Sequence, residues 1–160
     1  MNQLPPTSNP PCPLFGGIVV GIACGALFEA SVFIQALGWH QVLSGWYPMA
    51  SGENLNINRI WNGVAQLVAY VLLAVGLFML LRSSHRYDRW SAACLSGAIS
   101  IGWGGFNLIE SILAHEVLGM HHVNELVSAD ERFIWDMIML GSGAAALGTG
   151  IVLVALCDTK

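Results

Sequence analysis

Three of the five histidines lie in one short segment, "LAHEVLGMHHVNE", which covers residues 113–125. Neutral imidazoles combined with carboxylates are suitable ligands for Zn, Cu or Fe. Glu110 stands just before this segment, inside a long apolar run, and a carboxylate in such a run is costly and by default marks a functional site. We therefore interpret six residues as candidate metal ligands: Glu29, Glu110, His115, His121, His122 and Asp136.

Two structural alternatives remain open for these residues. Glu110 would be merely structural if it were paired with Asn107 or Ser111, and His121 and His122 would be ordinary interfacial residues if the apolar run simply ends there. The spacing matches no sharp metal motif such as H-E-x-x-H, in which the two histidines are four residues apart. The residue types therefore predict a metal site without identifying the ion.

The elements that carry these residues are predicted to be membrane helices. Hydrophobic residues make up 55% of the chain and charged residues only 10%, whereas a soluble domain has about 25% charged residues. Four apolar segments are long enough to cross a bilayer, which takes roughly 20 helical residues: Leu14–Leu37, Ile60–Leu81, Trp90–Ala114 and Phe133–Cys157. We expect an irregular arm, residues 1–13, followed by a single all-α membrane domain, residues 14–160.

The basic residues predict the orientation of these helices in the bilayer. Arg82, Arg86 and Arg89 crowd the loop between the second and third segments, so the positive-inside rule places this loop and both termini in the cytoplasm. The histidine-rich segment then faces the outer side.

The four cysteines show no C-x-x-C pairing, and three of them fall near the reducing side, so we expect them to be apolar filler and to form no disulfide. With six Lys and Arg in all, nucleic-acid binding has no electrostatic basis.

The two halves of the chain match each other when one is shifted by 81 residues. Glu29 then aligns with Glu110, Gly38 with Gly119, His40 with His121 and Val42 with Val123. Further along, "RIWNG" aligns with "FIWDM", so that Asn62 faces Asp136. The pattern predicts a four-helix bundle of two tandem two-helix repeats, about 14–82 and 90–157, related by an axis along the membrane normal. His40 and His121 would then face each other and could also bind a haem or a chlorophyll-type tetrapyrrole.

The second-half string "GGFNLIESILAHEVLGMHHVNE" resembles a family of small predicted bacterial membrane proteins, a domain of unknown function with a duplicated acidic and histidine-rich motif. The resemblance implies a four-helix bundle in a bacterial inner membrane, and it implies little about activity. This chain departs from the family pattern in its first half. Ile34, Gln41 and Gln66 stand where the pattern has histidine, and Asn62 stands where it has aspartate.

The sequence thus favours a multi-pass membrane protein with an outer-side cluster of glutamate and histidine that binds a transition metal (Cu, Zn or Fe) or a haem. No nucleophile elbow, phosphate-binding loop or dinucleotide fingerprint is present, so we expect no enzymatic activity. The alternative is a non-catalytic structural or accessory subunit of a larger membrane complex, with a pigment as one candidate ligand. Loss of histidines from the first half is what a relaxed demand for ligands would produce.

Overall fold

The computed structural model describes residues 12–84 and 91–158, and within these ranges the chain is helical and has no strand. The elements are α1 (Leu14–Glu29), η1 (Ala30–Ala36), α2 (Gly52–Ser84), α3 (Ala92–Glu110), η2 (Ser111–Val117) and α4 (Ala129–Asp158), where η marks a π-helix. Together they form four candidate membrane spans: Leu14–Ala36, Gly52–Ser84, Ala92–Val117 and Ala129–Cys157. The prediction of an all-α protein with four membrane helices is confirmed. Apart from residues 12–13, the expected N-terminal arm lies outside the described residues, as do Arg86 and Arg89.

Two of the helices begin earlier than their apolar segments suggest. Helix α2 begins at Gly52 rather than Ile60, and α4 begins at Ala129 rather than Phe133. The added turns read "GENLNINR" and "ADER", which are polar, so a search for apolar runs does not detect them. These first turns carry acidic side chains, Glu53 in α2 and Asp130 and Glu131 in α4, which favour a helix N-terminus.

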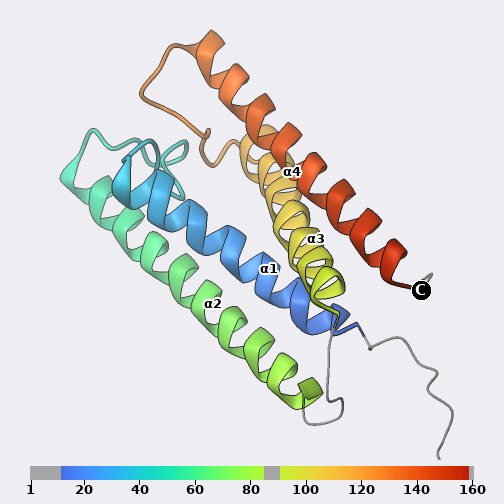
Figure 1. Ribbon diagram of the computed structural model, residues 1–160. Coiled ribbons are helices and arrows are strands. Elements are labelled where there is room, and N and C mark those ends of the chain that lie inside the picture. The colour runs from blue at the N-terminus through green and yellow to red at the C-terminus, as the bar shows by residue number, and fades with distance from the viewer. Residues whose placement is uncertain (1–11, 85–90, 159–160) are drawn as a thin grey trace, which may run out of the picture.

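The helices pack in the order α2, α1, α3, α4, with α1 and α3 as the central pair (Figure 1). Small residues allow this central pair to approach closely. A Cβ atom on Gly21 would collide with the carbonyl oxygen of Ile99, and one on Gly102 would collide with that of Ile18. Gly21 and Gly102 therefore allow the two membrane helices to pack with their backbones close together. Large apolar side chains, among them Leu67 and Phe78 of α2, are exposed on the outside, where lipid would cover them.

A disulfide joins Cys12 to Cys94, whose Cα atoms are 5.5 Å apart. The expectation that the chain has no disulfide was therefore wrong. Helices α1 and α3 begin at the same end of the molecule, so the residue two positions before α1 lies beside the first turn of α3. The two cysteines are 82 residues apart in sequence, a separation that gives no sign of this proximity.

Both central helices change to π-helix directly after their glutamate. The π-helices Ala30–Ala36 and Ser111–Val117 follow Glu29 and Glu110, and each ends just before a glycine with positive φ: Gly38 at 62° and Gly119 at 57°. Such a backbone conformation suits glycine because it has no Cβ. All these features stand 81 residues apart, as in the sequence alignment. They agree with a tandem repeat, and the duplication of a two-helix unit stays a prediction.

Candidate metal centre

The candidate site lies at the end of the molecule where two loops meet, opposite the C-terminus (Figure 1). After Gly38 and Gly119 the chain turns away from the π-helices, and the two loops then pair through their backbones. The Gly45 amide donates to the Met120 carbonyl at 2.6 Å, and the Glu125 amide donates to the Trp39 carbonyl at 3.0 Å. His40 and His121 each stand two residues after one of these glycines, and both side chains are buried.

The first group of potential ligands combines Glu29 with the two buried loop histidines. The Oε1 atom of Glu29 lies 3.5 Å from Nε2 of His40 and 3.9 Å from Nε2 of His121. The two imidazole rings stack with their centroids 4.3 Å apart and their planes 8° from parallel. The three ligand atoms all lie within 4.8 Å of one another, which is close enough to hold one metal ion.

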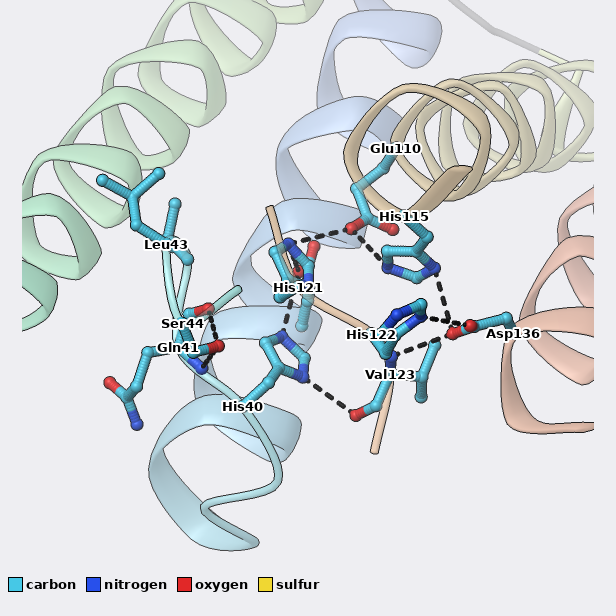
Figure 2. A network of polar contacts seen from close by, with 12 residues as sticks. His40, Gln41, Leu43, Ser44, Glu110, His115, His121, His122, Val123 and Asp136 are labelled. Atoms are coloured by element: carbon cyan, nitrogen blue, oxygen red, sulfur yellow. Dashed lines mark hydrogen bonds and ion pairs between the residues drawn. The ribbon is translucent and has the colours of Figure 1, made fainter. Parts of the chain in front are cut away.

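The second group consists of Glu110, His115 and, again, His121 (Figure 2). The Oε1 atom of Glu110 lies 3.0 Å from Nε2 of His115 and 3.4 Å from Nε2 of His121. His121 Nε2 is therefore common to both groups. Because the two glutamates end α1 and α3 and the close packing of these helices fixes their separation, His121 lies between two carboxylates.

Several polar atoms of these groups are buried and have no hydrogen-bond partner. They include Nε2 of His40, Nε2 of His115, Oε1 of Glu110 and Nδ1 of His121. The glutamate contacts described above are thus close in distance but lack the geometry of hydrogen bonds. A buried polar atom that lacks a partner is costly, and a bound ion is one way to satisfy it.

The backbone holds His40 in one orientation. Its Nδ1 lies 2.9 Å from the carbonyl oxygen of Val123, which can only accept a hydrogen bond, so the proton is on Nδ1. The Nε2 atom of the same ring faces Oε1 of Glu29 and is the atom available to an ion. Metal-bound histidines usually donate their second N–H to a carbonyl or carboxylate in this way.

Asp136, at the start of α4, organises the neighbouring side chains rather than joining either ligand group. Its Oδ1 accepts a hydrogen bond from the Val123 amide at 3.0 Å and lies 3.2 Å from Nδ1 of His115, and its Oδ2 lies 2.7 Å from Nδ1 of His122 (Figure 2). Both carboxylate oxygens are thus engaged. Asp136 is 2% exposed, whereas the side chain of His122 is 40% exposed. Among the six predicted metal ligands, these two take supporting positions and the other four lie in the ligand groups, together with His40.

Burial lowers the pKa of the His121 imidazole well below its ordinary value, and the neighbouring His40 and His115 lower it further. His121 is therefore neutral near pH 7. A metal ion binds the neutral form of histidine, so this ring is in the state that coordination requires.

In the first half, amides replace the supporting pair of the second half. Asn62 accepts a hydrogen bond from the Val42 amide, as Asp136 does from the Val123 amide, and its Nδ2 donates to Oε1 of Gln41. An amide pair thus stands where the second half has His122 and Asp136. Ile34 stands at the position equivalent to His115 and cannot bind an ion. The site is consequently asymmetric.

Sequence reasoning missed the residues of α2 that hold the first loop. Asn58 is 1% exposed, donates to the Tyr47 carbonyl at 2.8 Å and accepts from the Leu43 amide at 3.1 Å. Asn54 donates to the Pro48 carbonyl at 2.8 Å. A signal was present in the sequence, because Asn54, Asn58 and Asn62 are four residues apart and lie on one face of a helix.

A family model described as "Predicted membrane protein (DUF2243)" matches residues 16–156 of this chain. No curated protein matches the chain. No solved structure matches it either.

Proposed function

The chain belongs to the DUF2243 family of predicted membrane proteins, and we propose that it binds one divalent transition-metal ion, Zn²⁺ or Fe²⁺, at the buried cluster of Glu29, Glu110, His40, His115 and His121. The observation that carries the proposal is the sharing of His121 Nε2 by two buried three-ligand groups. We propose further that this binding is not linked to catalysis by the chain itself.

The distances between the ligand atoms support a single ion. Ligands at about 2.0–2.1 Å from a tetrahedral zinc ion are roughly 3.4 Å from one another. The four contacts between a glutamate oxygen and an imidazole nitrogen range from 3.0 to 3.9 Å. His121 Nε2 has one lone pair and can bind only one ion, so the two groups cannot be filled separately.

Charge balance also supports a divalent ion. Glu29 and Glu110 lie within the membrane spans Leu14–Ala36 and Ala92–Val117, where an uncompensated carboxylate is expensive. A divalent ion would neutralise both glutamates while the imidazoles stay neutral. Nitrogen and oxygen ligands without sulfur favour Zn²⁺ or Fe²⁺ over Cu⁺, which prefers thiolate and thioether ligands.

A tetrapyrrole fits the observed geometry less well. Two axial histidines must approach a haem iron from opposite faces of the porphyrin, but the rings of His40 and His121 are stacked directly on each other. The 4.3 Å between their centroids leaves no room for a porphyrin plane. The stacking therefore supports a bare ion over a tetrapyrrole held between these two histidines.

The proposal is tested by measuring the metal and pigment content of the protein purified in detergent. We expect one Zn²⁺ or Fe²⁺ per chain by elemental analysis, and no Soret absorption after incubation with haemin, because the cluster fits an ion and not a porphyrin. The test variant is Glu110→Gln, which removes a ligand. The matched control is Glu116→Gln, which alters an exposed glutamate in η2. Metal content that is equal in the two variants would contradict the site. A protein that purifies without metal or pigment, and cannot be loaded, would favour the accessory-subunit alternative.

For the orientation, we propose a bacterial inner membrane with both termini in the cytoplasm, because three arginines crowd residues 82–89. The Cys12–Cys94 disulfide lies at this same end and opposes the assignment, since disulfides persist in oxidising compartments. A fluorescent protein fused after Lys160 should fluoresce, and alkaline phosphatase fused there should be inactive. Active phosphatase at that position would reverse the orientation and place the metal cluster on the cytoplasmic side.

A further inference from the structure

Two adjoining cavities of about 420 and 550 Å³ run along the central helix pair and reach the metal cluster. Both are lined by Ile22, Phe106, Glu110, Ala114 and Met120, and we call them together the membrane crevice. The smaller cavity extends from Glu29 and His121 to Val68 and Leu72 of α2. Val68 is 53% exposed in the part of α2 that would contact lipid. The crevice therefore connects the bilayer interior with the cluster.

The equivalent positions in the other half of the chain are occupied by bulky aromatic residues. Ile22, Ile109, Ala114 and Met120 line the crevice, and the residues 81 positions away from them are Trp103, Phe28, Phe33 and Trp39. These aromatic rings form a continuous row. The ring centroids are 5.3 Å apart for Trp103 and Phe28, 5.7 Å for Phe28 and Phe33, and 5.4 Å for Phe33 and Trp39. The aromatic set takes Trp103 from the second half and the other three rings from the first, and at the matching positions the crevice has aliphatic side chains and a cavity.

The lining determines what kind of molecule could enter. Most of it is apolar, which suits a hydrocarbon tail, and the lining includes the aromatic rings of Trp61 and Phe106, which suit an aromatic head. At the inner end stand two carboxylates, which accept hydrogen bonds, and His121, which is 3% exposed and has an unpartnered Nδ1. A phospholipid head group is a poor fit, because its phosphate would face Glu29 and Glu110.

From this lining we propose that the membrane crevice binds a neutral hydroxylated aromatic molecule with an apolar tail, of the hydroquinone type, which enters from the bilayer and donates hydrogen bonds to the glutamates of the cluster. The inference rests on the proposed metal site, since the head group would lie beside the bound ion. The apolar lining of the crevice favours ligands that dissolve in the membrane over water-soluble molecules.

The probe for this inference is a decyl hydroquinone with a photoreactive diazirine on its chain, added to the full-length protein in detergent. Labelling should fall on the α2 peptide that contains Val68 and Leu72. Unlabelled decyl hydroquinone should compete with it, whereas decylbenzene, which has the tail without the hydroxyl groups, should not. Equal competition by both would show that only the tail is recognised, and labelling spread over the exposed residues of α4 would show ordinary partitioning; either result overturns the inference.

Filling the crevice provides a second, independent test. Val68→Trp should reduce labelling by about tenfold, because the loss of two buried methylene contacts is already worth that much, while bound zinc stays unchanged. The matched control is Leu67→Trp, at a neighbouring position that is 63% exposed and does not line the crevice. Unchanged labelling in a zinc-loaded Val68→Trp protein would overturn the inference. Wild-type protein that labels and competes as expected but never binds zinc would refute the metal site alone. If Val68→Trp loses zinc, the inference is decided by the wild-type competition between decyl hydroquinone and decylbenzene.

Discussion

Replacing His121 with alanine should lower the affinity of the purified protein for Zn²⁺ by more than about 100-fold, because mutation of a mere outer-shell partner already costs about 10–100-fold. Among the histidines that the structure describes, His121 alone belongs to both ligand groups. Its removal separates the Glu29–His40 pair from the Glu110–His115 pair, because His121 Nε2 is the atom that lies near both glutamates. The measurement is a competition titration of the detergent-solubilised protein against a zinc-binding dye.

Two further variants separate coordination from support in the same titration. Asp136→Asn should weaken zinc binding by about 10–100-fold, since the aspartate holds His115 in place and is not itself a ligand. His122→Ala should have a smaller effect than His121→Ala or Asp136→Asn, because the His122 ring is half-exposed, pairs with Asp136 and stands in neither ligand group. If His122→Ala and His121→Ala weakened binding equally, the assignment of His121 as the shared ligand would be wrong.

The membrane helices were predictable because the bilayer imposes a simple requirement on sequence. Each span needs roughly 20 apolar residues, and the four apolar segments meet it with few charges. The starts of α2 and α4 were less predictable, since they extend beyond the apolar region as polar turns. Their stability depends on contacts with the loops, such as those of Asn58, which an apolar pattern does not reveal.

The residues that form the metal site were predictable only in part. A glutamate in an apolar run is costly, and the 81-residue repeat pointed to His40 and His121 as partners. The division of roles was not predictable. It depends on the change from α-helix to π-helix after Glu29 and Glu110 and on the turn at Gly38 and Gly119, which together decide which ring nitrogen faces which carboxylate. No residue pattern in the sequence indicates a π-helix of this length.

The disulfide and the membrane crevice show what a single sequence leaves undetermined. Cys12 and Cys94 become neighbours only because two helices begin at the same end. The crevice exists because Ala114 and Met120 stand where the other half has Phe33 and Trp39. In the sequence these are ordinary apolar differences between two repeats. Only the packing of α1 against α3 shows that one set of side chains leaves a cavity beside the cluster.

Replacing Gly102 with alanine should destabilise the central helix pair by about 1–3 kcal/mol, the usual cost of overpacking a well-packed core. The new Cβ would meet the Ile18 carbonyl oxygen and would lie 2.9 Å from the backbone nitrogen of Ile22, so a backbone rather than a flexible side chain has to move. In a chain of this length such a loss corresponds to a fall of roughly 2–12 °C in the unfolding midpoint. The measurement is thermal unfolding in detergent.

Gly105→Ala is the matched control, because it lies one helical turn away in α3 and its new Cβ would meet no other atom within 4 Å. It should leave the midpoint unchanged or raise it slightly, since alanine is the better helix former. Equal midpoints for the two variants would contradict the close packing of α1 and α3. The two helices also carry Glu29 and Glu110 at their ends, so moving them apart lengthens the span that one ion must bridge. We therefore expect Gly102→Ala to bind zinc more weakly than Gly105→Ala even well below its unfolding temperature.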